Sequence, residues 1–195
     1  MSALVTTAAI ALAWLGPPGA ALPAAGDDDG PACLADGSGF LAARLRGGIE
    51  ADLDWRGAAL ECTGMARPDG RGLRLRFAGT LPDGRRLAIV FAPPELAEGQ
   101  DARAVPVNVT VLDETRGTIF GTRGEQRCTL DDVRQRRLDS DDPGERLWAV
   151  DGRGFCTEPA RALDGNGALL LTRFDFRGSV TWRDDEATPG DTVSP

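Results

Sequence analysis

The sequence predicts an all-β fold, an antiparallel β-sandwich or barrel with one short helix, stapled by disulfides. Apolar and polar residues alternate along most of the chain, which is the pattern of half-buried strands. Turn residues divide the alternating segments into about nine or ten short strands, as in antiparallel all-β domains. A chain of 195 residues has the length of a single domain.

The composition changes along the chain and predicts four regions. We expect a signal peptide over residues 1–25, a flexible N-terminal segment over residues 26–36, a single β domain over residues 37–183 and a disordered tail over residues 184–195. The first 26 residues carry no charged side chain, and a 13-residue apolar run precedes small residues and prolines. This is the pattern of a secretory signal. The run is too short for a bilayer span of about 20 residues, so no transmembrane span is expected after cleavage.

The four cysteines are Cys33, Cys62, Cys128 and Cys156. An even number of cysteines in an exported chain predicts two disulfides, because the compartments outside the cytoplasm are oxidising. Three connectivities are possible. We favour Cys33–Cys62 with Cys128–Cys156, because these pairs close loops of similar size. Export also predicts a periplasmic or extracellular location.

The first strands are expected between residues 41 and 55, where the odd-numbered residues are apolar and most even-numbered ones are charged. A three-residue loop, Arg46 to Gly48, would pair Leu45 with Ile49 and keep both faces uniform, with Gly48 in the left-handed conformation. One continuous bent strand would keep the faces uniform as well. In either case the charged side chains point away from the core.

A short internal repeat predicts the next strands. The segments "PDGRGLRLRFAG" from Pro68 and "PDGRRLAIVFAP" from Pro82 are offset by 14 residues and match at seven of twelve positions. Each begins with a Pro-Asp-Gly turn and continues as an alternating strand, so the two strands are expected to be antiparallel neighbours.

Later strands are predicted by alternation and by a turn signal. Valines alternate with polar residues over 107–111, and apolar residues hold one parity from Leu170 to Trp182. An Asp151–Gly152 turn would place Trp148 opposite Phe155 in a hairpin.

The one predicted helix covers residues 129–138, "TLDDVRQRRL". Thr129 can cap its first turn, and Leu130, Val133 and Leu138 follow helical spacing.

The composition excludes several kinds of chemistry. The chain has no His and no Tyr, and its 22 basic residues are all Arg. Catalysis by Ser-His-Asp or Cys-His sites, Schiff-base chemistry and Walker-type phosphate loops are therefore excluded. The net charge of -8 argues against nucleic-acid binding, which needs a basic surface. The exclusive use of Arg indicates a GC-rich, bacterial genome.

Three carboxylates, Glu50, Asp52 and Asp54, are candidate ligand or cation-binding residues. Carboxylates two apart on a strand are about 6.8 Å apart, which lies within the spacing of an inverting glycosidase pair. Every alternating acidic strand has this spacing, so a solvated surface is favoured over calcium binding and over catalysis. The loop from Asp139 to Glu145 is a second calcium candidate, but it lacks the EF-hand pattern.

Three arginines, Arg134, Arg136 and Arg137, are candidate contacts for an anion or a partner, because guanidinium groups bind carboxylates and phosphates bidentately. In the predicted helix, Asp131 and Asp132 would instead pair with Arg134 and Arg136 three or four residues on. We favour this plain surface explanation.

The tryptophans Trp55, Trp148 and Trp182 have the parity of the core residues, so they are predicted to pack inside rather than to form a sugar-binding platform.

These observations favour a non-catalytic, exported β-domain that binds an envelope or extracellular partner, which we expect to be a protein. The alternative is a carboxylate-dependent glycoside hydrolase, or a calcium-assisted carbohydrate-binding module, built on the three carboxylates of residues 50–54. No cofactor is expected apart from the weak indication of calcium.

Overall fold

The computed structural model describes residues 33–68, 71–122 and 127–183, so the predicted signal peptide (1–25) and tail (184–195) lie outside the described residues. The described chain is built almost entirely of strands, with one 3₁₀ turn at Gly57–Ala59. The predicted all-β antiparallel fold class is confirmed. The strands are β1 (Phe40–Gly47), β2 (Ala51–Arg56), β3 (Glu61–Ala66), β4 (Leu73–Thr80), β5 (Arg86–Ala92), β6 (Ala102–Pro106), β7 (Asn108–Asp113), β8 (Thr118–Gly121), β9 (Cys128–Arg137), β10 (Glu145–Cys156), β11 (Ala160–Ala162) and β12 (Ala168–Arg183).

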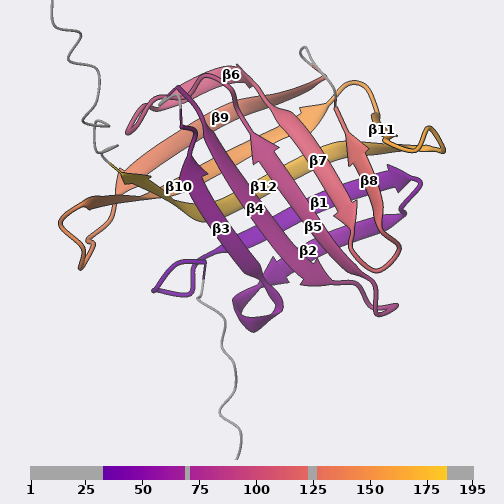
Figure 1. Ribbon diagram of the computed structural model, residues 1–195, viewed down its shortest axis with the longest axis horizontal. Helices are drawn as coiled ribbons and strands as arrows, with labels where there is room; N and C mark the ends of the chain where they lie inside the picture. Colours follow the sequence, from indigo (N-terminus) through magenta and orange to yellow (C-terminus); the bar gives the residue numbers. More distant parts are fainter. Residues whose placement is uncertain (1–32, 69–70, 123–126, 184–195) are drawn as a thin grey trace, which may run out of the picture.

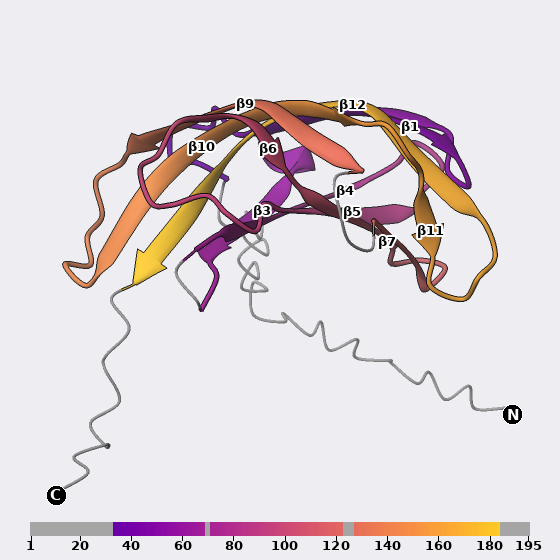
Figure 2. The same ribbon diagram turned by 90° about the horizontal axis from the view of Figure 1, so that it is seen from above.

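The strands form two layers. One contains β2, β1, β12, β10, β9 and β6 in spatial order, and the other contains β11, β8, β7, β5, β4 and β3. The strands of the two layers cross at a steep angle (Figure 1), and β1, β9, β10 and β12 arch over the second layer (Figure 2). The long strand β12 joins the layers, because β11 pairs with it at Leu169 and β3 pairs with it at Thr181.

Four phenylalanines fill the space between the layers. Phe77 of β4 and Phe91 of β5 face Phe174 and Phe176 of β12, and all four are at most 1% exposed. The Phe91 ring centroid lies 4.7 Å from that of Phe174 and 4.8 Å from that of Phe176. Because burial of each such ring contributes about 1.5–3 kcal/mol, this cluster is a principal source of cohesion between the two layers.

Both favoured disulfides are confirmed. The Cys33–Cys62 bond ties the segment before β1 to β3, and the Cys128–Cys156 bond joins register partners on β9 and β10. The structure describes only residues 33–36 of the predicted flexible segment 26–36, and the first of these, Cys33, is buried.

The predicted helix at residues 129–138 is wrong, because these residues lie in strand β9. A β-bulge causes the error: Leu130 pairs with Gly154 and Asp132 with Arg153, which leaves Asp131 as the extra residue. The bulge places the core-facing Leu130 and Val133 three residues apart and so imitates helical spacing. Pairing with β10 on one side and β6 on the other overrides the local signal.

The predicted hairpin between β1 and β2 is present, but its register is displaced. Leu45 pairs with Ala51 rather than with Ile49, so the loop spans five residues, Arg46 to Glu50. Gly47, and not Gly48, has the positive φ, at 106°. Ile49 turns into the core from the loop, which accounts for the two extra residues.

The predicted turn at Asp151–Gly152 is also wrong, since β10 continues straight through it. Trp148 pairs with Val180 and Arg137, and not with Phe155. Gly152 is needed there for packing, because a β-carbon would lie 2.4 Å from Cζ of Phe176.

The parity predicted for β12 holds only in its second part. Leu169 and Leu171 are buried before the register shift, whereas Thr172 is exposed. A bulge at Thr172 restores the parity of Phe174 onward.

Candidate functional site

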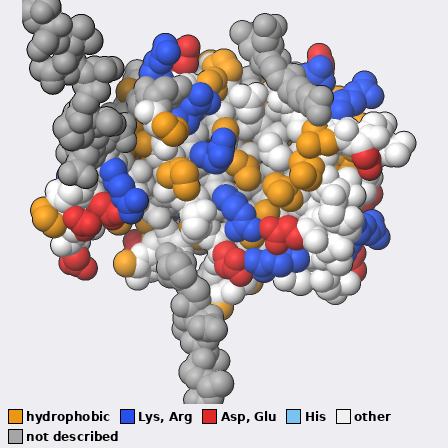
Figure 3. All heavy atoms as spheres, viewed as in Figure 1, with side chains coloured by type: hydrophobic (Ala, Val, Ile, Leu, Met, Phe, Trp, Pro, Cys, Tyr) orange, Lys and Arg blue, Asp and Glu red, His pale blue; other side chains and the backbone are white. Residues whose placement is uncertain are grey.

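The strongest candidate site is the outer surface of the layer formed by β3, β4, β5, β7, β8 and β11, which we call the arginine face. We define it as the outward-facing side chains of these strands together with Glu114 of the β7–β8 turn and Leu163, which directly follows β11. Arginine side chains run down its middle, with acidic groups at one end of the run and hydrophobic groups beside it (Figure 3). The arginines of the face are Arg74 and Arg76 on β4, Arg86 on β5, and Arg161 on β11 at the edge of the layer.

The arginine face differs in charge from the rest of the chain. Its four arginines stand against two glutamates, Glu61 and Glu114, while the whole chain has a net charge of -8. Arg76 and Arg86 make ion pairs with the two glutamates. Arg74 and Arg161 have no ion pair among the described residues. The excess positive charge of the face therefore rests on these two side chains.

Strand register places small residues between the arginines. One row across the sheet, which we call row A, begins at Arg76 of β4 and ends at Arg161 of β11, through direct register partners. Only small or medium side chains lie between them. Row A consists of Arg76, Val90, Thr110, Gly121 and Arg161.

A second row, row B, runs beside row A and is apolar. Ala88 pairs with Leu112, and Leu112 pairs with Ile119. Leu163 extends the row: its backbone N–H donates to the Ile119 carbonyl, and its side chain is 49% exposed. The face thus combines the exposed Leu163 and the half-buried Leu112 and Ile119 with guanidinium groups on the same sheet.

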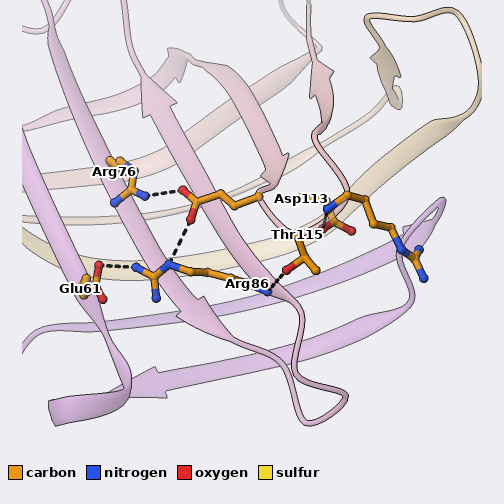
Figure 4. Close-up of polar contacts among 7 residues, drawn as sticks. Glu61, Arg76, Arg86, Asp113 and Thr115 are labelled. Atoms are coloured by element: carbon orange, nitrogen blue, oxygen red, sulfur yellow. Dashed lines mark hydrogen bonds and ion pairs between the residues drawn. The ribbon is translucent and has the colours of Figure 1, made fainter.

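A network of ion pairs covers one end of the face (Figure 4). Arg86 donates to Glu61 and, through Nε, to Glu114 Oε2 at 3.0 Å. Arg76 Nη2 donates to Glu114 Oε1 at 2.6 Å. The hydrogen bond to Glu61 raises the pKa of Arg86, against the opposing effect of burial, and the charges of Glu61 and Glu114 raise it further.

The network crosses strands rather than following them. Arg86 on β5 reaches Glu61 on β3 over the intervening β4, and Glu114 reaches Arg76 on β4 over β5. Ala78 and Ala88 lie beneath these links and have no exposed surface. Two adjacent small residues therefore let the long side chains lie flat on the sheet.

The start of the β7–β8 turn positions Glu114. The Glu114 N–H donates to the Arg86 carbonyl, and the Thr115 hydroxyl accepts from the Arg86 N–H at 2.9 Å. Asp113 is only 2% exposed, accepts from the Arg116 N–H at 3.0 Å and lies 3.5 Å from Nη1 of Arg85. The turn is thereby fixed to β5, which holds the Glu114 carboxylate over the sheet.

A second polar cluster lies between the β5–β6 connection and β10. Glu98 accepts from Arg146 Nε at 2.8 Å and from Trp148 Nε1 at 2.9 Å. Burial alone would raise the pKa of Glu98, but the hydrogen bonds from Arg146 and Trp148 together hold it below its ordinary value. Gln135 donates to the Ala97 carbonyl at 2.8 Å and so anchors the same connection on β9. These contacts fix the β5–β6 connection to β9 and β10.

The predicted acidic residues lie on or beside β2, in the other layer, each with an arginine partner. Asp52 lies 2.8 Å from Arg46 Nη2, and Asp54 lies 2.8 Å from Arg56 Nε. Glu50 lies 3.8 Å from Arg46 Nε and accepts the Gly47 N–H at 2.8 Å. The three side chains are 65–67% exposed. The three carboxylates lie in a line along the edge strand β2 and do not point toward a common centre.

The predicted arginine group is divided between two surfaces. Arg134 and Arg136 point outward from β9, beside Asp151 and Ala149 of β10. Arg137 has the opposite orientation and lies over the Trp148 ring, with Cζ 5.6 Å from the ring centroid. The three side chains therefore do not form one binding site.

The tryptophans pack largely as their parity predicts. Trp55 and Trp182 are each 5% exposed, and Trp148 is half-buried against the core. None of them offers a flat exposed ring for a sugar.

The arginine face was not found from the sequence, although part of its signal is visible there. Arg74 and Arg76 alternate with Leu73, Leu75 and Phe77, so their outward orientation could be predicted. The order β11–β8–β7–β5–β4–β3 could not, because it depends on which strands pair. Without that order, Arg161 cannot be placed in the same row as Arg76.

No family model matches the chain, and no curated protein or solved structure matches it either. Among the described residues, no group of three or more cysteine, aspartate or glutamate side chains is placed to hold a metal ion. In the same part of the chain, no helix has the length and apolar character needed to cross a membrane.

Proposed function

We propose that the protein is an exported, non-catalytic β-domain that binds a protein partner in the cell envelope or outside the cell, and that it does so through the arginine face. The observation that carries the proposal is the presence of Arg74 and Arg161, neither with an ion pair among the described residues, on the same sheet as the exposed Leu163. Arginine is enriched at protein interfaces, where apolar groups form the buried centre.

Export is supported by two features. The apolar run before residue 26 has the pattern of a secretory signal. The two disulfides use all four cysteines, which is typical of chains that fold in an oxidising compartment. Both features support a periplasmic or extracellular location.

The absence of catalysis is supported by the side chains of the two layers. The chain has no His, Tyr or Lys, so carboxylates would have to perform general acid or base chemistry. Glu61 and Glu114 on the arginine face, and Asp52 and Asp54 on β2, are each engaged by arginine. No contact of the β2 carboxylates favours the alternative of a glycoside hydrolase or a calcium-assisted carbohydrate-binding module.

Site-specific photo-crosslinking in the cells that make the protein tests the proposal. A photoreactive residue at Leu163 samples the arginine face, and one at Phe155, which is 38% exposed on the opposite layer, is the matched control. We expect one discrete protein adduct from position 163 and none, or only a weak one, from position 155. Equal adducts from both positions, or none from position 163, would contradict the proposal.

A further inference from the structure

Row A has dimensions that suit an extended peptide. From Arg76 to Arg161 there are four steps between neighbouring strands. At about 4.8 Å a step, the two arginines are about 19 Å apart along the row. An extended chain rises about 3.3 Å per residue, so six to seven residues, roughly, cover this distance.

The side chains between the two arginines leave room for such a segment. Val90, Thr110 and Gly121 are shorter than the arginines at the ends of the row, and Gly121 has no side chain at all. Row B flanks them with Leu112 and Ile119, which are half-buried and apolar. A peptide across the strands would therefore contact small and apolar groups in its middle and guanidinium groups at its ends.

The charges define what the ends of the peptide must carry. Arg161 and Arg74 have no carboxylate partner among the described residues, and Arg74 lies two residues from Arg76 on β4. A guanidinium group binds a carboxylate bidentately. Arg161 at one end of row A, and Arg74 beside Arg76 at the other end, thus each offer a site for a carboxylate, while the centre offers none.

We propose that row A binds an extended acidic segment of the partner protein, with one carboxylate at Arg161, another at Arg74 beside the Arg76 end of the row, and small or aliphatic residues between them. The inference rests on the proposed function and specifies the chemistry of the partner. A polyphosphate such as nucleic acid is a poorer match, because it carries a charge at every nucleotide, whereas the middle of row A (Val90, Thr110 and Gly121) is uncharged. A second copy of the chain would bring a net charge of -8 to the interface, whereas the proposed segment needs only two carboxylates, one for each end of row A.

Fluorescence anisotropy with labelled seven-residue peptides tests the inference on the full oxidised protein. The first peptide has a glutamate at each end and Ala, Val and Ser between, which places the carboxylates about 20 Å apart. The second peptide has the same composition with the two glutamates adjacent. The third has glutamine in place of both glutamates. Sedimentation velocity on the same samples reports self-association.

We expect the first peptide to bind at least about tenfold more tightly than the other two, a difference of about 1.4 kcal/mol. The R74E/R161E variant should lose this binding by a similar factor. The matched control is R153E/R173E, since Arg153 and Arg173 are exposed on the opposite layer and have no ion pair among the described residues either. It should bind within about twofold of the parent protein. Thermal unfolding of both variants checks that they fold.

Three results would overturn the inference: equal binding of the two glutamate peptides, equal weakening by both variants, or a dimer that buries the arginine face and dissociates in R74E/R161E. A failure here is distinguishable from failure of the proposed function. A discrete adduct at position 163 without acidic-peptide binding removes only the inference, whereas the absence of any adduct at position 163 of the parent protein removes the proposed function.

Discussion

Replacement of Arg86 tests whether the ion-pair network on the arginine face stabilises the fold. Arg86 pairs with Glu61 and Glu114, and its side chain is 36% exposed. An exposed ion pair contributes about 0.2–1 kcal/mol, so the loss of two pairs in R86M should lower the free energy of unfolding by about 1 kcal/mol. In a domain of this size that lowers Tm by about 2–4 °C.

The two pairs should contribute unequally. Glu114 is 31% exposed and Glu61 is 55% exposed, so solvent screens the Glu114 pair less. In double-mutant cycles, R86M with E114Q should therefore give a larger coupling energy than R86M with E61Q. R86A should lose more than R86M, because the methionine side chain continues to cover Ala78 and Ala88.

Urea unfolding, followed by tryptophan fluorescence at low salt and at about 1 M NaCl, measures these quantities. R153M is the control, because Arg153 has no ion pair among the described residues, and its effect should stay within about 0.5 kcal/mol. A loss in R86M that is unchanged at high salt, together with zero coupling in both cycles, would refute the electrostatic account of the network.

Three further changes give distinct outcomes. Phe91→Ala should lower the free energy of unfolding by about 3–5 kcal/mol, because the ring is fully buried against Phe77, Phe174 and Phe176. A loss below about 1 kcal/mol in urea unfolding would contradict its place in the core. The pKa of Glu98 is lowered in the folded protein, so its carboxylate stabilises the fold fully above about pH 4.3, and this contribution is lost as the pH falls through the folded-state pKa. The difference in free energy of unfolding between the parent and E98Q should therefore shrink toward about pH 3. A difference that grows on acidification would contradict the lowered pKa. Ala104 has a φ of 53°, a left-handed conformation in which a β-carbon costs about 1–2 kcal/mol. The A104G substitution removes this cost but loses about 0.4–1 kcal/mol, because glycine makes the unfolded chain more flexible. A104G should therefore raise Tm slightly, and a lower Tm would show that the conformation is not strained.

The fold class could be predicted because its signals are local. Alternation on β4 and β5 and the two Pro-Asp-Gly turns identify strands without knowledge of their neighbours. The cysteine spacing favoured the observed disulfides because the two bonds close loops of similar size, with sequence separations of 29 and 28. The errors occur where a distant contact changes a local pattern, as with the bulge at Asp131 and the packing of Phe176 on Gly152.

The candidate site could be predicted only in part, because it depends on strand order. The three carboxylates on or beside β2 alternate in the sequence, and their exposure follows from parity, but their arginine partners come from the same strand, the same loop and the neighbouring strand. Row A joins residues from Arg76 to Arg161, which become neighbours only through four strand pairings. No periodicity in the sequence predicts which strands pair in this way.

The arginine face is proposed to bind a protein partner through Arg74 and Arg161, the two of its arginines without an ion pair among the described residues. The yield of the photo-crosslinked adduct from position 163, compared between the parent sequence and R74E/R161E in the cells that make the protein, tests it most directly. The account predicts a discrete adduct that is lost in R74E/R161E and retained in R153E/R173E. An adduct that persists unchanged in R74E/R161E would contradict it.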